Sequence, residues 1–191
     1  MSLSKQTKLQ HLLWRAGFGP DTRNWSDWEQ LDESAWWPKL LQDATAEPTF
    51  FDVADGAIKG LVMGIGELGK MEPSQKELTE TQKKKLRQQS REDIKSLNLI
   101  WLEEMVHTQA PLREKMALFW HGHFASRNLN VLYQQELLHI IRQQALGNFG
   151  DLLRAVSKSA AMLAFLNNQQ NKKQHPNENF AREVMELFTL G

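Results

Sequence analysis

Apolar residues recur at helical spacing along most of the chain, and this feature constrains the fold more than any other. The spacing is clear in the stretches from Leu9 to Ala16 and from Phe149 to Leu163, while strand-like alternation is almost absent. Gly17 can end the first stretch as a helix C-cap, and Asn148 followed by Asp151 resembles a helix start. The sequence therefore predicts an all-α, irregular multi-helix domain with long loops and no significant sheet.

The longest predicted helix begins after Pro73 and carries two apolar stripes in its second half. The first stripe consists of Ile94, Leu97, Trp101 and Met105, and the second of Leu99, Leu102 and Val106. A helix that is apolar on two sides is typical of a buried position. We therefore expect this half of the helix to be buried on both sides.

The chain is long enough for one domain, and we predict a single helical domain over residues 1–191 with an irregular, Gly-rich connection at 50–73. Within that connection, Gly64–Lys70 fits two phosphate-loop patterns. Met71 stands where such a loop needs Ser or Thr, and Pro73 interrupts the helix that should follow. We expect an inter-helix connection there and no bound nucleotide.

The charge balance and composition exclude several classes of partner and site. Lys+Arg and Asp+Glu both number 23, so no overall positive field favours nucleic acid. Residues 75–95 carry seven basic and four acidic side chains without interleaved aromatics, which indicates a solvated helix face. The absence of cysteine excludes disulfides and thiolate metal sites. No apolar run is long enough for membrane insertion and no signal peptide is visible, so we expect a soluble chain of unknown compartment.

Two histidines separated by one glycine form a candidate site in F-W-H-G-H-F, at His121 and His123. On a regular helix their side chains would point about 200° apart, whereas an extended backbone would let them share a metal ion. Metal sharing therefore requires the helix to break at Gly122. In the structural alternative, one histidine caps terminal carbonyls and the other fills the edge of the core.

The C-terminal stretch from Asn177 to Gly191 is predicted to form an amphipathic helix with a dense polar face. Its apolar side consists of Phe180, Val184, Leu187 and Phe188. Its polar side carries Asn179, Glu183 and Glu186, with Glu178 and Arg182 spaced as an i, i+4 ion pair. Carboxylates and amides near histidines suit a metal or a polar ligand.

Four blocks of the sequence resemble a bacterial family known as domain of unknown function 1800. They are L-L-W-R-A-G-F-G-P from Leu12, F-W-H-G-H-F, F-L-N-N-Q-Q-N and P-N-E-N-F-A-R-E-V-M-E-L-F-T-L-G. The resemblance implies a helical fold, a bacterial source and frequent export. It also implies a longer protein, of which this chain is an N-terminal portion on which a C-terminal remainder packs.

Two functional hypotheses follow. As an enzyme, the chain would hold a metal-assisted or hydrolytic site in which His121, His123, Glu183 and Arg182 are catalytic, with Asn177, Glu178, Asn179 and Glu186 binding the ligand. A divalent metal would then be held by His121 and His123. As the alternative, a non-catalytic structural or partner-binding module would use the same residues as a buried polar network. Under both hypotheses Arg182 and Glu178 or Glu183 are expected to face the histidine pair.

Overall fold

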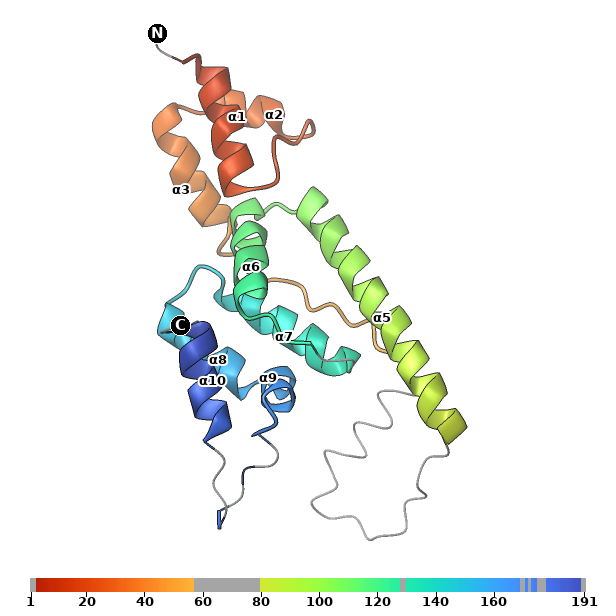
Figure 1. Ribbon diagram of the computed structural model, residues 1–191. Coiled ribbons are helices and arrows are strands. Elements are labelled where there is room, and N and C mark those ends of the chain that lie inside the picture. Colours follow the sequence, from red (N-terminus) through yellow and green to blue (C-terminus); the bar gives the residue numbers. More distant parts are fainter. Residues whose placement is uncertain are drawn as a thin grey trace.

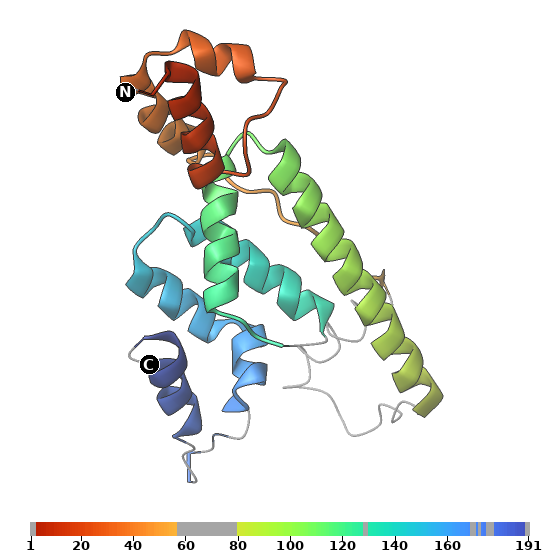
Figure 2. The same ribbon diagram turned by 45° about the horizontal axis from the view of Figure 1, so that its top comes forward.

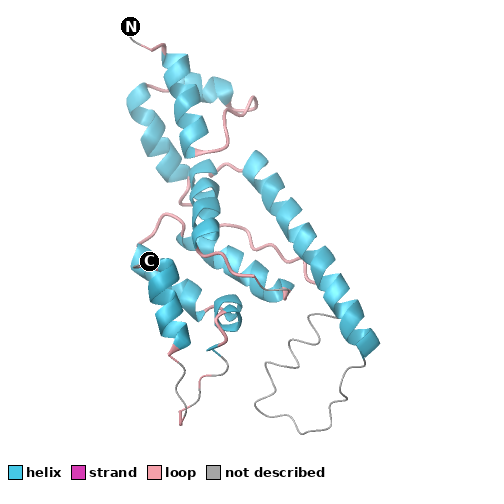
Figure 3. Ribbon diagram, in the orientation of Figure 1, coloured by secondary structure: helices cyan, strands magenta, loops and turns pink. Residues whose placement is uncertain are grey.

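The computed structural model describes residues 3–56, 80–127, 130–168, 171, 173–174 and 178–189. Helices make up 71% of these residues, and the described part of the chain contains no strand (Figure 3). The predicted all-α fold class is therefore confirmed. Among the described residues, no helix is both long and apolar enough to cross a membrane.

Nine helices are present in the described residues (Figure 1). They are α1 (Lys5–Ala16), α2 (Trp25–Gln30), α3 (Glu33–Asp43), α5 (Glu80–His107), α6 (Pro111–His123), α7 (Val131–Gln144), α8 (Phe149–Lys158), α9 (Ala160–Phe165) and α10 (Asn179–Phe188).

The first three helices form a small cluster at one end of the molecule. Their apolar sides bury Leu9, Trp36 and Leu40 against one another. Leu112, from the first turn of α6, belongs to the same cluster. The N-terminal end of α6 therefore fastens this cluster to the rest of the molecule.

A larger core is formed by the six helices α5, α6, α7, α8, α9 and α10, with α7 at its centre. Helix α7 contacts α5, α6, α8 and α9, and it buries Leu137 and Ile141. Phe124, at the end of α6, and Phe188, at the end of α10, are also buried in this core. The C-terminal helix is thus positioned by Phe188, which is buried, and by Phe180 and Val184, which pack against the same core.

Helix α5 stands at the side of this core and is buried on one side only. Its inner stripe, which includes Leu97 and Trp101, is buried. The second stripe is exposed: Leu99, Leu102 and Val106 keep 66%, 55% and 64% of their surface in solvent. The expectation of two-sided burial is therefore wrong, since no described helix lies along the outer side of α5 in either view (Figures 1 and 2).

The predicted connection at 50–73 is described only as far as residue 56. Its first part is irregular and attached to neighbouring helices: Val53 N donates to Gln135 Oε1 at 3.3 Å, and Asp55 N donates to Asp93 Oδ2 at 3.1 Å. The Gly64–Lys70 stretch lies outside the described residues. The single domain over residues 1–191 stays a prediction.

Candidate functional site

The two histidines lie on one unbroken helix. Helix α6 continues through Gly122 and ends at His123, with Phe124 as its C-cap. Residues two apart on a helix point about 200° apart, so His121 and His123 face different neighbours. The helix break that a shared metal site requires is not formed.

His123 faces the end of α10. Its Nε2 lies 3.1 Å from the carbonyl oxygen of Phe188, so this ring nitrogen carries the proton and donates. Four aromatic rings, from Trp120, Phe124, Phe149 and Phe188, contact the His123 ring, and the residue as a whole stays exposed. A donor at the last carbonyls of a helix satisfies a group that has no partner within the helix. His123 therefore holds the C-terminal end of α10 in place.

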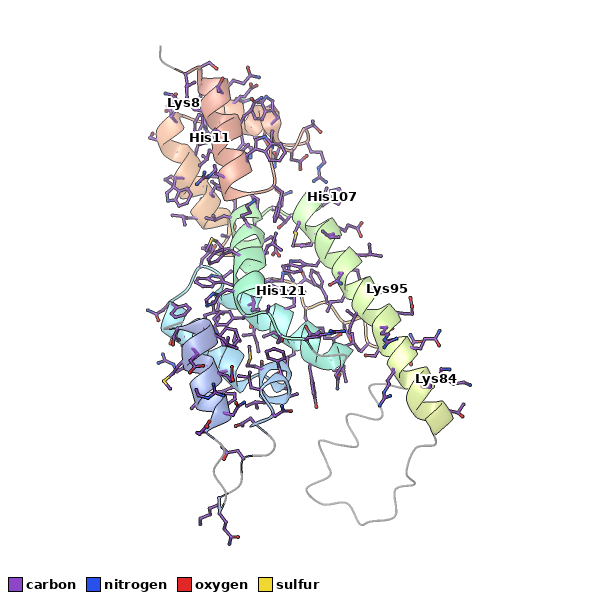
Figure 4. The ribbon with its side chains drawn as sticks, viewed as in Figure 1. Lys8, His11, Lys84, Lys95, His107 and His121 are labelled. Carbon is purple, nitrogen blue, oxygen red and sulfur yellow. The ribbon has the colours of Figure 1, made fainter. Side chains whose placement is uncertain are left out.

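His121 faces the opposite neighbour, α5. Its ring lies edge-on to Trp101, with ring centroids 5.2 Å apart, and it is half-buried there (labelled in Figure 4). Burial lowers the pKa of His121 below its ordinary value near 6.5, because the charged form loses solvation. The contacts of the two histidines are those of the structural alternative: His123 binds a terminal carbonyl, and His121 lies at the edge of the core.

The lowered pKa of His121 predicts an acid-dependent loss of stability. As pH falls through 6.5, the unfolded chain binds a proton that the folded chain resists, so the free energy of unfolding decreases. We expect His121→Gln to reduce this decrease between pH 7.5 and 5, measured by urea unfolding at both pH values. An equal decrease in wild type and His121→Gln would contradict the prediction.

Arg182 is the centre of an exposed polar cluster on α10. Its guanidinium donates to Asn179, Glu183 and Glu186 at 2.8, 2.9 and 3.1 Å, and it lies 3.9 Å from the Glu178 carboxylate. The Arg182 side chain is 46% exposed, and that of Glu178 is 80% exposed. The expectation that Arg182 faces the histidine pair is wrong, because α10 approaches His123 through Phe188, about 9 Å further along the helix axis.

The predicted site residues do not come together as one constellation. Only His123 of the pair contacts α10, and the carboxylates of α10 bind Arg182 instead. No group of three or more His, Asp or Glu side chains able to hold a metal occurs in the described part of the chain. Asn177 lies outside the described residues.

A buried ion network, which the sequence analysis missed, connects α5, α6 and α7. Glu114 is fully buried and accepts hydrogen bonds from Trp101 Nε1 at 3.0 Å, Arg113 Nε at 3.1 Å and Arg142 Nε at 2.9 Å. Arg142 Nη2 donates to the second oxygen of Glu114 at 3.0 Å, which makes the pair bidentate. Such a pair fixes the orientation of both side chains.

The same network holds the chain that follows α3. Arg142 Nη1 donates to the carbonyl oxygen of Thr49 at 2.6 Å, and its guanidinium stacks on the ring of Phe51 at 4.1 Å. Arg113 Nη1 donates to the carbonyl oxygen of Ala46. The two arginines are 6% and 1% exposed, and both line a pocket of about 420 Å³ beside the end of α3. The hydrogen bonds of the network join α5, α6, α7 and the chain after α3.

The outer side of α5 is the surface with the most unusual composition. Five basic side chains occur between residues 84 and 95, and the exposed stripe of Leu99, Leu102 and Val106 follows them. At 100° per residue, Lys84, Arg91 and Lys95 lie within about 60° of the stripe. The stripe is about 130° around the helix from its buried side. One face of α5 thus carries three basic side chains and the acidic Glu92 in its first half, and it is apolar in its second half.

Comparison with known proteins places the chain in a family. A family model described as "Protein of unknown function (DUF1800)" matches residues 11–191, so the chain belongs to this family. The family resemblance seen in the sequence is therefore confirmed. Neither the curated proteins nor the solved structures contain a significant match.

Proposed function

We propose that this chain is a non-catalytic helical module that binds another polypeptide through the outer face of α5. The observation that carries the proposal is the exposed stripe of Leu99, Leu102 and Val106. Single exposed apolar residues are normal on a protein surface, but a contiguous apolar strip indicates an interaction site. These three residues repeat at i, i+3 and i+7, which is the pattern by which one helix packs along another.

The basic first half of the same face indicates the chemistry of the partner. Lys84, Arg91 and Lys95 are exposed, and within the described part of the chain only Lys95 of the three has an ion-pair partner, Glu92 at 2.8 Å. Figure 4 labels Lys84 and Lys95 along α5. A partner helix with an apolar stripe would cover the leucines, and acidic side chains on its flank would meet the basic turns. We therefore infer an acidic amphipathic helix as the partner.

A metal-assisted or hydrolytic function gains no support from the described geometry. His121 packs on Trp101, while His123 binds a backbone carbonyl. A metal or a general base needs a lone pair directed at the reacting group, and a shared metal needs converging ligands. These contacts therefore favour the partner-binding alternative.

The test uses a designed helical peptide of about 20 residues, long enough to form a helix in water. It carries a fluorescent label, a leucine stripe and glutamates on both flanks of the stripe. We expect fluorescence anisotropy to show binding of this peptide, with an affinity that falls as salt is added. The control peptide has lysine in place of every glutamate and should bind at least about tenfold more weakly.

Two results would contradict the proposal. Equal binding of the acidic and basic peptides would show that the basic side chains of α5 do not select the partner. If neither peptide binds, the proposed function is wrong. Vesicles of phosphatidylserine and of phosphatidylcholine form a separate arm. Selective binding to phosphatidylserine without binding to the acidic peptide would assign the face to a membrane surface instead.

A further inference from the structure

A pocket lies at the C-terminal end of the α5 stripe. Its volume is about 440 Å³, and it is enclosed by the loop from Phe18 to Asn24, the end of α5 and Pro111 at the start of α6. In Figure 4, His107 marks this end of α5 beside the loop that follows α1. The volume is in the range of small-ligand pockets, so the pocket has room for one large aromatic side chain.

Gly17 and Gly19 allow the loop from Phe18 to Asn24, which forms one wall of the pocket, to pack closely against its neighbours. A Cβ on Gly17 would come within 2.9 Å of the Pro111 ring, so the loop is packed directly against α6. Gly19 has φ +111°, and a Cβ there would lie 3.0 Å from the Trp14 ring. Gly19 therefore combines a backbone conformation that favours glycine with close contact to an aromatic ring. The pocket wall is held by packing on both sides.

The pocket combines an apolar floor with a polar rim. Leu13, Phe18 and Met105 are among the apolar residues of the floor. At the rim, Arg23 binds Asp21 through two nitrogens, with Nη2 2.6 Å from Oδ2 and Nε 2.9 Å from the same oxygen. This hydrogen-bonded guanidinium lowers the pKa of Asp21, so the rim carries a full carboxylate at neutral pH.

Val106 belongs to both the stripe and the pocket. A helix that packs along Leu99, Leu102 and Val106 therefore contacts one residue of the pocket lining at its end. We propose that the pocket receives one tryptophan side chain of the helix that binds α5, as the anchor of that interface. This inference rests on the proposed function and adds to it the residue type that gives the partner its affinity.

Tryptophan fits the pocket chemistry better than the other apolar side chains. Its large ring would cover the floor residues, and its single N–H needs one acceptor. The last carbonyls of a helix have no N–H donor within the helix, and those of Val106 and His107 lie at this end of α5. The Val106 carbonyl accepts a hydrogen bond from Arg23 Nη2, but its length of 3.5 Å is at the long limit for such a bond, so this bond is weak. The Arg23 guanidinium also lies at the rim, where it can stack on an indole.

The experiment compares acidic peptides that differ at their ends. One peptide carries tryptophan at its N-terminal end, one at its C-terminal end, and both are compared with the matching alanine peptides, so that either helix direction is tested. We expect one tryptophan peptide to bind at least about tenfold more tightly than its alanine partner. In Thr22→Phe, whose ring would fill the pocket from the loop, this advantage should disappear while the alanine peptide binds as it does to wild type.

The outcomes separate the two proposals. If tryptophan and alanine peptides bind equally, the pocket is not an anchor site, although binding through α5 stands. If no peptide binds, the proposed function itself is wrong. Because the peptide comparison on the wild-type chain requires no protein substitution, it remains decisive if Thr22→Phe disturbs the loop. A tryptophan advantage that survives in a folded Thr22→Phe variant would place the anchor elsewhere.

Discussion

Glu114→Ala is expected to lower the free energy of unfolding by about 3–5 kcal/mol, measured by urea denaturation followed by circular dichroism. The carboxylate is fully buried and is the bidentate partner of Arg142, which is 1% exposed. Removing Glu114 leaves the Arg142 charge away from water with only Glu104, at 3.3 Å, as a carboxylate partner. It also removes the acceptor of the Trp101 indole.

Two further variants distinguish the loss of stability in Glu114→Ala from the smaller loss expected when an exposed ion pair is removed. Glu92→Ala removes an exposed carboxylate that pairs with Lys95 and should change the free energy of unfolding by at most about 1 kcal/mol. Glu114→Leu combined with Arg142→Met removes both members of the bidentate pair, leaves Arg113 as the one buried charge of the network, and should cost less than Glu114→Ala alone. If Glu114→Ala costs no more than Glu92→Ala, the buried network contributes nothing to the fold.

Replacing both Leu99 and Leu102 with serine is expected to weaken binding of the acidic peptide by at least about 100-fold, as measured by anisotropy titration. The two leucines form the centre of the exposed stripe, and central apolar residues carry most of the affinity of an interface. Because both are exposed in the free chain, the same substitutions should leave its stability nearly unchanged.

A matched control exists on α10, where Met185 and Leu187 are 49% and 53% exposed. Replacing these two residues with serine removes similar apolar surface from another helix and should leave peptide affinity unchanged. A comparable loss in both double variants would show that the peptide binds exposed apolar residues without selectivity. Such a result would contradict a binding site on α5.

Helix type and several helix ends could be predicted because local residues determine them. Helix α1 ends at Gly17 as its C-cap, and α8 begins after Asn148, whose side chain accepts a hydrogen bond from Gly150 N at 2.8 Å. Caps and apolar spacing act within a few residues of the chain. These features are therefore visible without knowledge of the tertiary structure.

The buried network was not predicted because charged residues on helices are usually exposed. One signal was nevertheless present in the sequence. Glu114 lies four residues after Ala110 and three before Ala117, and both alanines are buried. Arg142 lies in the same relation to Leu138 and Ala145, which are also buried. Two opposite charges at core positions of neighbouring helices are typical of a buried pair.

The surroundings of α5 and α10 could not be derived from amphipathic spacing. Spacing shows that Leu99 and Leu102 share a side, but it does not show what covers that side. Similarly, the polar spacing around Arg182 is satisfied by neighbours on its own helix, so it required no contact with the histidines. In both cases the missing information is which elements pack together.

Hydrogen exchange of the chain with and without the acidic peptide tests the central proposal most directly, because it reports where the peptide lies. We expect the peptide to slow exchange of backbone amides in the second half of α5, around residues 96–107, and in the Phe18–Asn24 loop. Amides of α8 and α10 should exchange at unchanged rates. Slower exchange confined to α10, or no slowing at α5 with the peptide bound, would contradict the proposal that the outer face of α5 is the binding surface.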